Sequence, residues 1–128
     1  ALETALKLKE TARIFAEAYS TADFEHGPTA LAAAGVPTLA FRPRGAVGRM
    51  VDDALRRVVE QGGSCWVVGD EPSALVTDRP ALILSTIIEE LSPISFVIPG
   101  QLLAEAVASS LGLDPDAPVG LSKVTLTS

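Results

Sequence analysis

Four side chains of this chain have types that could carry chemistry together: Lys7, Glu10, His26 and Lys123. Glu10 is a carboxylate that can take up or release a proton, and the His26 imidazole exchanges protons near neutral pH. A lysine amine becomes a nucleophile when it is desolvated or lies near another cation. These residue types are therefore suited to acid–base and nucleophilic chemistry.

Each of these residues also has a plain structural explanation. Lys7 and Glu10 are three residues apart, so on a helix they can form a solvated ion pair that contributes only about 0.3 kcal/mol. His26 precedes a Gly-Pro pair and can belong to a turn, and Lys123 can be one charge on a tail. Spacing alone does not separate a functional site from these explanations.

The sequence lacks the motifs of several well-defined sites. It contains no GxGxxG, no P-loop, no HExxH and no metal-spaced cluster of cysteine and histidine. One histidine and one cysteine, Cys65, argue against a structural zinc site, and a single cysteine cannot form an intrachain disulfide. A Ser-His-Asp arrangement stays open, but nothing marks a nucleophile elbow. We therefore predict neither a metal nor a cofactor, and we expect Cys65 to lie in the core.

Composition narrows the class of protein. The chain has 128 residues, 48% of them hydrophobic, which fits one domain with a substantial core. A formal net charge of -6 argues against non-specific nucleic-acid binding, although a few cations and backbone N–H groups suffice for one phosphate. No run reaches the ~20 apolar residues of a membrane span. With no signal-like segment and one cysteine, we expect a cytoplasmic protein without a membrane partner.

Residues 1–19 are predicted to form the helix that positions Lys7 and Glu10. Glu3, Lys7 and Glu10 fall within a narrow arc on the polar side of this helix. The opposite side is apolar, with residues recurring at alternating steps of four and three: Ala1, Ala5, Leu8, Ala12, Phe15 and Tyr19.

The rest of the chain reads as alternating strands and helices. Ser20 begins a short helix as its N-cap. A long helix is predicted to open with Ser92 as N-cap and Pro93 at the first helical position, and Pro99 is expected to kink or interrupt it. The predicted elements after residue 19 are a short helix from 20, a helix at 30–34, strands at 37–41, 64–68 and 81–85, and helices at 47–61 and 92–112.

Continuous apolar strands that alternate with helices indicate a parallel sheet covered on both faces. We therefore predict one three-layer α/β domain spanning residues 1–128. A doubly wound domain normally opens with a strand, whereas this chain opens with a helix. We expect the missing first strand to come from another segment, or the chain to be an excised fragment.

Three groups of short motifs occur in order along the chain. They are ETALKLKE at 3–10, AEAY at 16–19 and HGP at 26–28; PGQLLA at 99–104; and GLDPD at 112–116 with LSKVT at 121–125. Together these motifs resemble sugar isomerase (SIS) domains, most closely the second SIS domain of two-domain amino-sugar-phosphate enzymes, in which Pro-Leu-Gln-Leu-Leu-Ala corresponds to PGQLLA. The similarity extends from Ala1 to Thr125 and implies the flavodoxin-like SIS fold.

The resemblance implies a role for each residue. Glu10 corresponds to the carboxylate that moves a proton between C1 and C2 of the sugar, and Lys7 lies beside that base. His26 corresponds to the histidine that assists ring opening across a subunit interface. Lys123 corresponds to the lysine that forms an imine with the open-chain ketose. We also expect Glu3 and Lys7 to contact the substrate, because both share the arc of Glu10.

The implied function is aldose–ketose isomerisation with deamination of an amino-sugar phosphate, of the glucosamine 6-phosphate to fructose 6-phosphate type. Alternatives are the isomerase domain of glutamine–fructose-6-phosphate aminotransferase and a non-catalytic sugar-phosphate-sensing module. Retention of Glu10, His26 and Lys123 speaks against sensing alone. Some departures favour the deaminase or isomerase: Thr4 for the usual Gly, Val119-Gly120 for Arg-Asn, and Ser128 for Glu.

The family's phosphate-binding loop lies in the first SIS domain. The resemblance therefore implies a second SIS domain as partner, on the same longer chain or on another subunit, and a homodimer. We expect this chain to be inactive alone.

Overall fold

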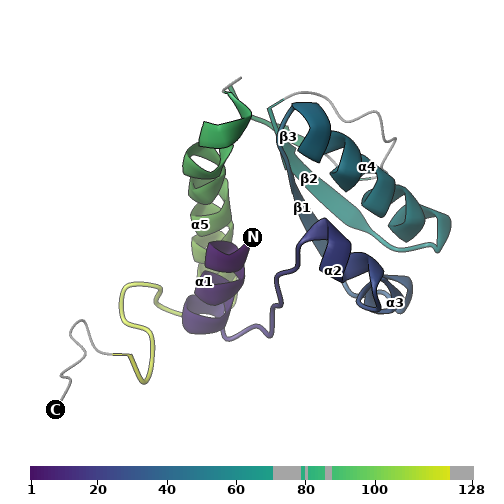
Figure 1. Ribbon diagram of the computed structural model, residues 1–128. Helices are drawn as coiled ribbons and strands as arrows, with labels where there is room; N and C mark the ends of the chain where they lie inside the picture. Colours follow the sequence, from purple (N-terminus) through teal and green to yellow (C-terminus); the bar gives the residue numbers. More distant parts are fainter. Residues whose placement is uncertain (71–78, 80, 86–87, 122–128) are drawn as a thin grey trace, which may run out of the picture.

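A computed structural model describes residues 1–70, 79, 81–85 and 88–121 (Figure 1). The elements within these residues, in chain order, are α1 (Leu2–Ala12), α2 (Thr21–Glu25), α3 (Thr29–Ala33), β1 (Thr38–Arg42), α4 (Gly45–Glu60), β2 (Cys65–Gly69), β3 (Ala81–Ile83), the 3-10 helix η1 (Glu89–Leu91) and α5 (Ser92–Ser110).

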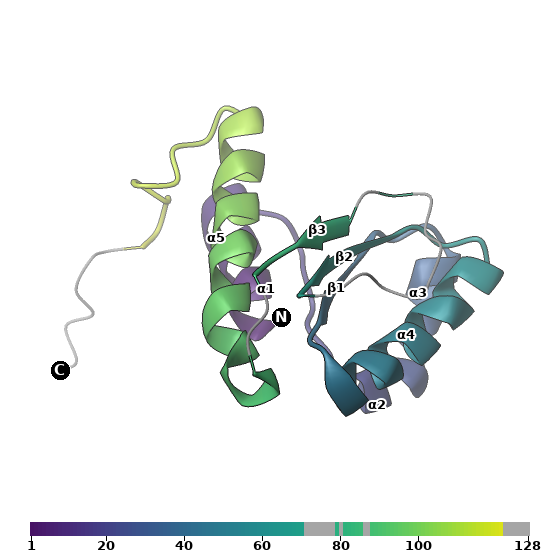
Figure 2. The same cartoon turned by 90° about the horizontal axis from the view of Figure 1, so that it is seen from above.

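The three described strands form one parallel sheet in the order β1-β2-β3. Thr38 pairs with Cys65, and Val67 pairs with Ala81, so the carboxyl ends of β1 and β2 lie at the same edge. Helices α1 and α5 lie on one side of the sheet, and α4 with α2 and α3 lies on the other (Figures 1 and 2). The predicted three-layer α/β class is confirmed.

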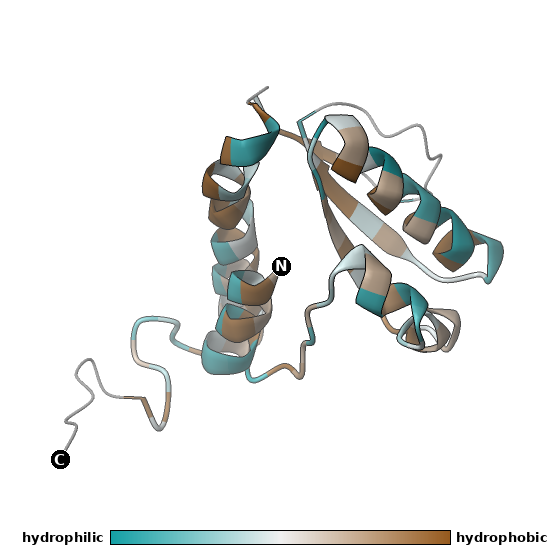
Figure 3. Cartoon of the chain, in the orientation of Figure 1, coloured by the Kyte–Doolittle hydropathy of each residue, from teal (hydrophilic) through white to brown (hydrophobic). Residues whose placement is uncertain are grey.

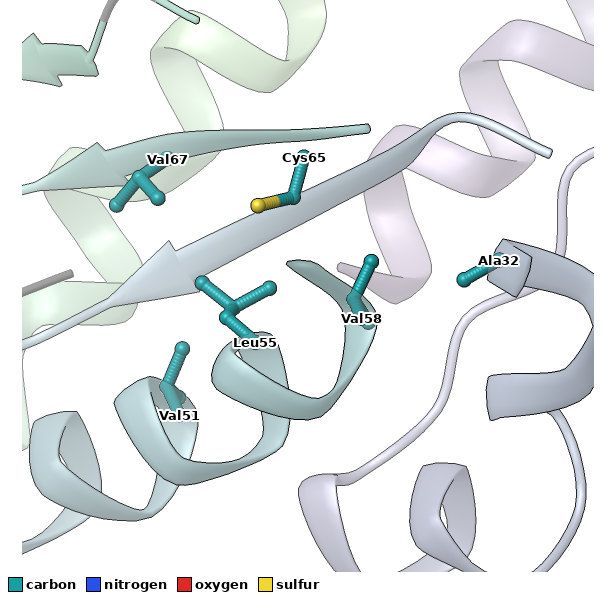
Figure 4. Close-up of a cluster of buried hydrophobic side chains, with 6 residues drawn as sticks. All are labelled: Ala32, Val51, Leu55, Val58, Cys65 and Val67. Atoms are coloured by element: carbon teal, nitrogen blue, oxygen red, sulfur yellow. The ribbon is translucent and has the colours of Figure 1, made fainter. Parts of the chain in front are cut away.

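Helix α4 forms because its apolar side chains share one face. Val51, Leu55 and Val58 point from this helix toward Cys65 and Val67 of β2 (Figure 4), and Ala32 of α3 closes the cluster. The opposite face is charged, which gives α4 its alternating colours in Figure 3. The helix ends before Gly62, whose φ of 80° only glycine adopts readily. Cys65 is fully buried, so its predicted core position is confirmed.

The first helix is shorter than predicted. It ends at Ala12 because Arg13 adopts the left-handed conformation, with φ 56° and ψ 30°, and its backbone N–H donates to Leu8 O. The apolar periodicity continues through Phe15 and Tyr19, but Phe15 is 84% exposed and Tyr19 is also exposed. Since most helical stability in proteins comes from tertiary packing, the pattern does not extend the helix past its packed part.

Helix α5 also corrects a prediction, because Pro99 lies inside one continuous helix and does not interrupt it. Phe96, Gly100 and Ala104 are buried on both sides of the proline, and this packing offsets the one lost backbone hydrogen bond. Ser92 is the first residue of the helix and Leu91 is its N-cap, because η1 runs directly into α5. The predicted N-cap is therefore one residue too late.

Among the described residues, Glu89–Ser110 is the one helical segment that length and composition would allow to cross a membrane. The same two properties occur in core helices of soluble proteins, so they are weak evidence. In this structure the segment packs against α1 and approaches the sheet.

A buried ion pair ties β1 to α4. Arg42 donates from Nε to Asp52 Oδ1 at 2.8 Å and from Nη2 to Asp52 Oδ2 at 2.7 Å, and both side chains are almost fully buried. Buried charges depend on their partners, so this pair fixes the loop after β1 against α4.

Replacement of Asp52 by Ala is expected to lower the free energy of unfolding by about 3–5 kcal/mol, because it leaves the Arg42 guanidinium buried without its carboxylate. Urea unfolding measures the change. Asp53→Ala is the matched control, since Asp53 pairs with Arg56 at 2.8 Å on the exposed side of the same helix. That variant should lose less than about 1 kcal/mol. Equal losses would contradict the account.

Candidate functional site

Helix α1 holds three of the predicted site residues on one side. Lys7 Nζ donates a hydrogen bond to Glu10 Oε2 at 2.7 Å, and the two side chains are 35% and 26% exposed. Thr11 Oγ1 donates to the Lys7 carbonyl at 2.8 Å. The Lys7–Glu10 pair is therefore a defined, half-buried contact, in the place where helical spacing predicts one.

The hydrogen bond to Glu10 raises the pKa of Lys7 above its usual value, and the charges of Glu10 and Glu3 act in the same direction. Partial desolvation opposes this effect but does not overcome it. Lys7 is consequently an ammonium group at neutral pH. It can donate hydrogen bonds and stabilise negative charge, but it is neither a base nor an amine nucleophile in this state.

Glu3 lies two turns before Glu10 and contacts the neighbouring helix. Gln101 Nε2 of α5 donates to Glu3 Oε1 at 3.1 Å. This contact links the first turn of α1 to the middle of α5. The expected contact of Glu3 with substrate stays a prediction.

His26 lies in a different layer from the Lys7–Glu10 pair. It is the exposed C-cap of α2, and its backbone N–H donates to Asp23 O at 3.2 Å. Helix α2 packs on α4, whereas α1 packs on α5 across the sheet (Figures 1 and 2). Within one chain, His26 and Glu10 are therefore not brought together. Lys123 lies outside the described residues.

Sequence inspection missed a second group of charges, at the carboxyl edge of the sheet. Asp70 directly follows β2, its side chain is fully buried, and its Oδ2 lies 3.3 Å from Arg44 Nε. The available signal was position, because polar residues just after parallel strands often mark functional edges. This pair joins the loops after β1 and β2.

An open groove of about 490 Å³ adjoins this edge. Glu3 is among its lining residues, but Lys7 and Glu10 are not; other lining residues are Thr4, Phe41, Glu89, Ser92 and Phe96. Residues 1–70, 79, 81–85 and 88–121 contain no cluster of three histidine, cysteine or carboxylate side chains that could hold a metal ion.

Comparisons with known proteins give consistent results, although no protein-family model matches the chain. Glutamine–fructose-6-phosphate aminotransferase [isomerizing] of Escherichia coli K12 is 38% identical over 125 residues, which are 96% of this chain and 20% of that protein. The Pyrococcus horikoshii protein of the same name is 35% identical over 123 residues, or 96% of this chain and 21% of that protein. The chain thus spans about one fifth of the length of these relatives.

A solved structure agrees in fold and sequence. The C-terminal domain of glucosamine-fructose-6-phosphate aminotransferase from Francisella tularensis superposes with a TM-score of 0.79 and 33% identity, over 87% of this chain and 32% of that one. The parallel three-layer fold, the motifs on α1 and α5 and these similarities lead to one conclusion: the chain belongs to the sugar isomerase (SIS) domain family.

Proposed function

We propose that this chain supplies the proton-transferring carboxylate, Glu10, to a phosphosugar isomerase unit. The whole protein would convert an amino-sugar phosphate into a ketose phosphate with loss of ammonia, of the glucosamine 6-phosphate to fructose 6-phosphate type. The observation that carries the proposal is the Lys7–Glu10 hydrogen bond of 2.7 Å, which holds a half-buried carboxylate in one orientation beside a cation.

In the proposed reaction, Glu10 removes the C2 proton of the open-chain aldose, and the electron pair forms a C1–C2 double bond while the aldehyde oxygen gains a proton. Return of the proton from Glu10 to C1, with loss of one proton from the nitrogen, leaves an imine at C2. Water adds to this carbon and ammonia departs, which gives the ketose. A positioned carboxylate suits both proton transfers.

The Lys7 ammonium supports these steps from beside the base. It contacts Oε2 of Glu10, and because a carboxylate has several lone-pair sites, Glu10 can hold Lys7 and still accept a proton. Lys7 also places positive charge near the carbon atoms where an enolamine or enediolate develops. We propose that Glu3, further along the same arc, contacts the substrate.

We propose that His26 assists ring opening in the site of a second subunit. The position of His26 in the layer opposite Glu10 supports this division, because one chain does not bring the two residues together. A homodimer would complete each site with a histidine from its partner. Lys123 is proposed to hold the open-chain ketose as an imine.

A further SIS domain is the proposed partner that binds the phosphate. This chain spans only about one fifth of the length of its relatives, which leaves room for such a domain on the same longer chain. Helix α5 also exposes an apolar row, formed by Ile94, Ile98 and Leu102 at steps of four residues, and each is more than half exposed. Such rows usually pack against protein, so α5 is suited to contact with that partner.

The isomerase domain of a glutamine–fructose-6-phosphate aminotransferase is the second candidate. It is favoured by the 38% identity to the Escherichia coli protein of that name. Both candidates need proton transfer between C1 and C2, so Glu10 has the same role in each. They differ in the source or fate of the nitrogen.

Replacement of Glu10 by Gln in the full-length protein should abolish proton exchange, because the amide cannot act as a base, whereas sugar-phosphate binding should persist. A loss of about 10²–10⁴-fold is expected. Deuterium incorporation from solvent into the sugar, followed by NMR, measures the exchange. Glu17→Gln is the control, since Glu17 is exposed and lies beyond the end of α1. Unchanged exchange in the Glu10 variant would remove Glu10 from the mechanism.

Mixing two inactive full-length variants tests the division of the site between subunits. Glu10→Gln and His26→Asn proteins are each expected to be nearly inactive. After subunit exchange, half of the dimers would be hybrids with one intact site of two, so about a quarter of the wild-type activity should return. Mixed samples that stay inactive despite proven subunit exchange would show that Glu10 and His26 belong to the same subunit.

The same Glu10→Gln variant should lower the pKa of Lys7 toward its usual value, because the hydrogen bond to the carboxylate is the main cause of the rise. In the parent, the pKa of Lys7 is higher in the folded state than in the unfolded state, where it is about 10.4. The pair therefore stabilises the folded state at pH values below about 10.4, and this stabilisation is lost as pH rises through the pKa of Lys7 in the folded state. NMR titration of the lysine side chains checks the direction. A pKa of Lys7 that is the same in both proteins would disprove the coupling.

A further inference from the structure

Helices α1 and α5 are in close contact at Thr4 and Gly100. Thr4 is 4% exposed and Gly100 is buried. A Cβ atom added at Gly100 would lie well inside van der Waals contact with Thr4 Oγ1, 3.2 Å from Thr4 Cβ and 3.4 Å from Phe41 Cζ. The two helices therefore leave no room for a side chain at position 100.

The lack of space for a side chain explains why position 100 is a glycine, and backbone conformation does not. Gly100 lies in the interior of α5 and has none of the positive φ values found at Gly45 or Gly62. Glycine inside a helix costs about 1 kcal/mol relative to alanine. The chain therefore carries a residue unfavourable for the helix at the one point where Thr4 fills the contact.

Other contacts between α1 and α5 surround the Thr4–Gly100 contact. The neighbouring residues Glu3 and Gln101 share the interhelical hydrogen bond of 3.1 Å. Small residues are also buried further along both helices. They are Ala5 and Ala12 on α1, and Ala104 and Ala108 on α5.

We propose that Thr4 and Gly100 are a matched pair of positioning residues that sets the spacing of α1 on α5 and thereby the placement of Glu10. This inference rests on the proposed role of Glu10. Glu10 follows Thr4 by six residues, or about 9 Å along the helix axis. A shift at Thr4 is therefore carried rigidly to the carboxylate.

The expected size of the effect follows from the overlap. An added methyl group at position 100 overlaps Thr4 Oγ1, and the overlap is relieved by a new Thr4 rotamer together with a shift of α1 on α5. A misplacement of about 1 Å can lower a catalytic rate by about 10²-fold. The loss should appear in kcat through Glu10 and also in KM, because Glu3 and Lys7, the proposed substrate contacts, move with the same helix.

The experiment compares four full-length proteins in proton exchange and in thermal unfolding: the parent, Gly100→Ala, Thr4→Gly, and the double variant. Gly100→Ala should lower kcat by about 10²-fold. Thr4→Gly in the same protein removes the opposing side chain and should restore kcat to within about tenfold of the parent. The Tm changes of the two single variants should be strongly non-additive in the double variant.

Val58→Ala is the matched control for a purely structural effect. Val58 is a fully buried residue of α4, on the other side of the sheet, so its truncation lowers Tm without moving α1. Assayed below every Tm, this variant should keep its kcat. A Gly100→Ala protein with normal kcat, a double variant without recovery, or an equal kcat loss in Val58→Ala would each overturn the proposal.

The two proposals fail in different ways. A parent protein without any proton exchange would refute the proposed function and the catalytic consequence of the pair. The unfolding measurements would still test whether Thr4 and Gly100 are packed as a matched pair. Additive Tm changes in the double variant would overturn that claim.

Discussion

The close packing of α1 on α5 is the constraint on which the rest of the candidate site depends. Helix α1 is anchored through its small buried face on α5, and α5 reaches the sheet through Phe96, whose ring centroid lies 6.2 Å from that of Phe41 on β1. The sheet therefore positions α5, α5 positions α1, and α1 positions Glu10. Small residues are suited to fixing the position of α1 on α5, because they allow the two backbones to come close together and have few side-chain rotamers.

The layers explain how one domain could take part in more than one site. Helix α1, which carries Glu10 and Lys7, lies on the α5 side of the sheet, and α2, which ends at His26, lies on the α4 side (Figure 2). Under the proposed function, each copy contributes a base to one site and a ring-opening histidine to another. The phosphate would be bound elsewhere, by a further SIS domain. Such a division makes assembly a condition of catalysis, because one chain does not bring its own Glu10 and His26 together.

Local patterns in the sequence predicted the parallel sheet, α4 and the Lys7–Glu10 pair, since each depends on residues close together in the chain. They overextended the first helix, because periodicity continues through Phe15 although no tertiary contact holds it. They also could not reveal contacts between distant segments. The Glu3–Gln101 bond spans 98 residues, and the Thr4–Gly100 contact becomes visible only once the two helices are packed. The Arg44–Asp70 pair likewise depends on the alignment of two strand ends.

The most direct test of the central claim is a crystal structure of the full-length protein with an open-chain sugar phosphate bound. The account predicts the Glu10 carboxylate about 3–3.5 Å from C1 and C2 of the sugar, as a base in a near-attack geometry must be. It also predicts Lys7 still bonded to Glu10, and the His26 imidazole of a neighbouring subunit near the ring oxygen position. A sugar bound with Glu10 turned to solvent, or far from both carbons, would contradict the account.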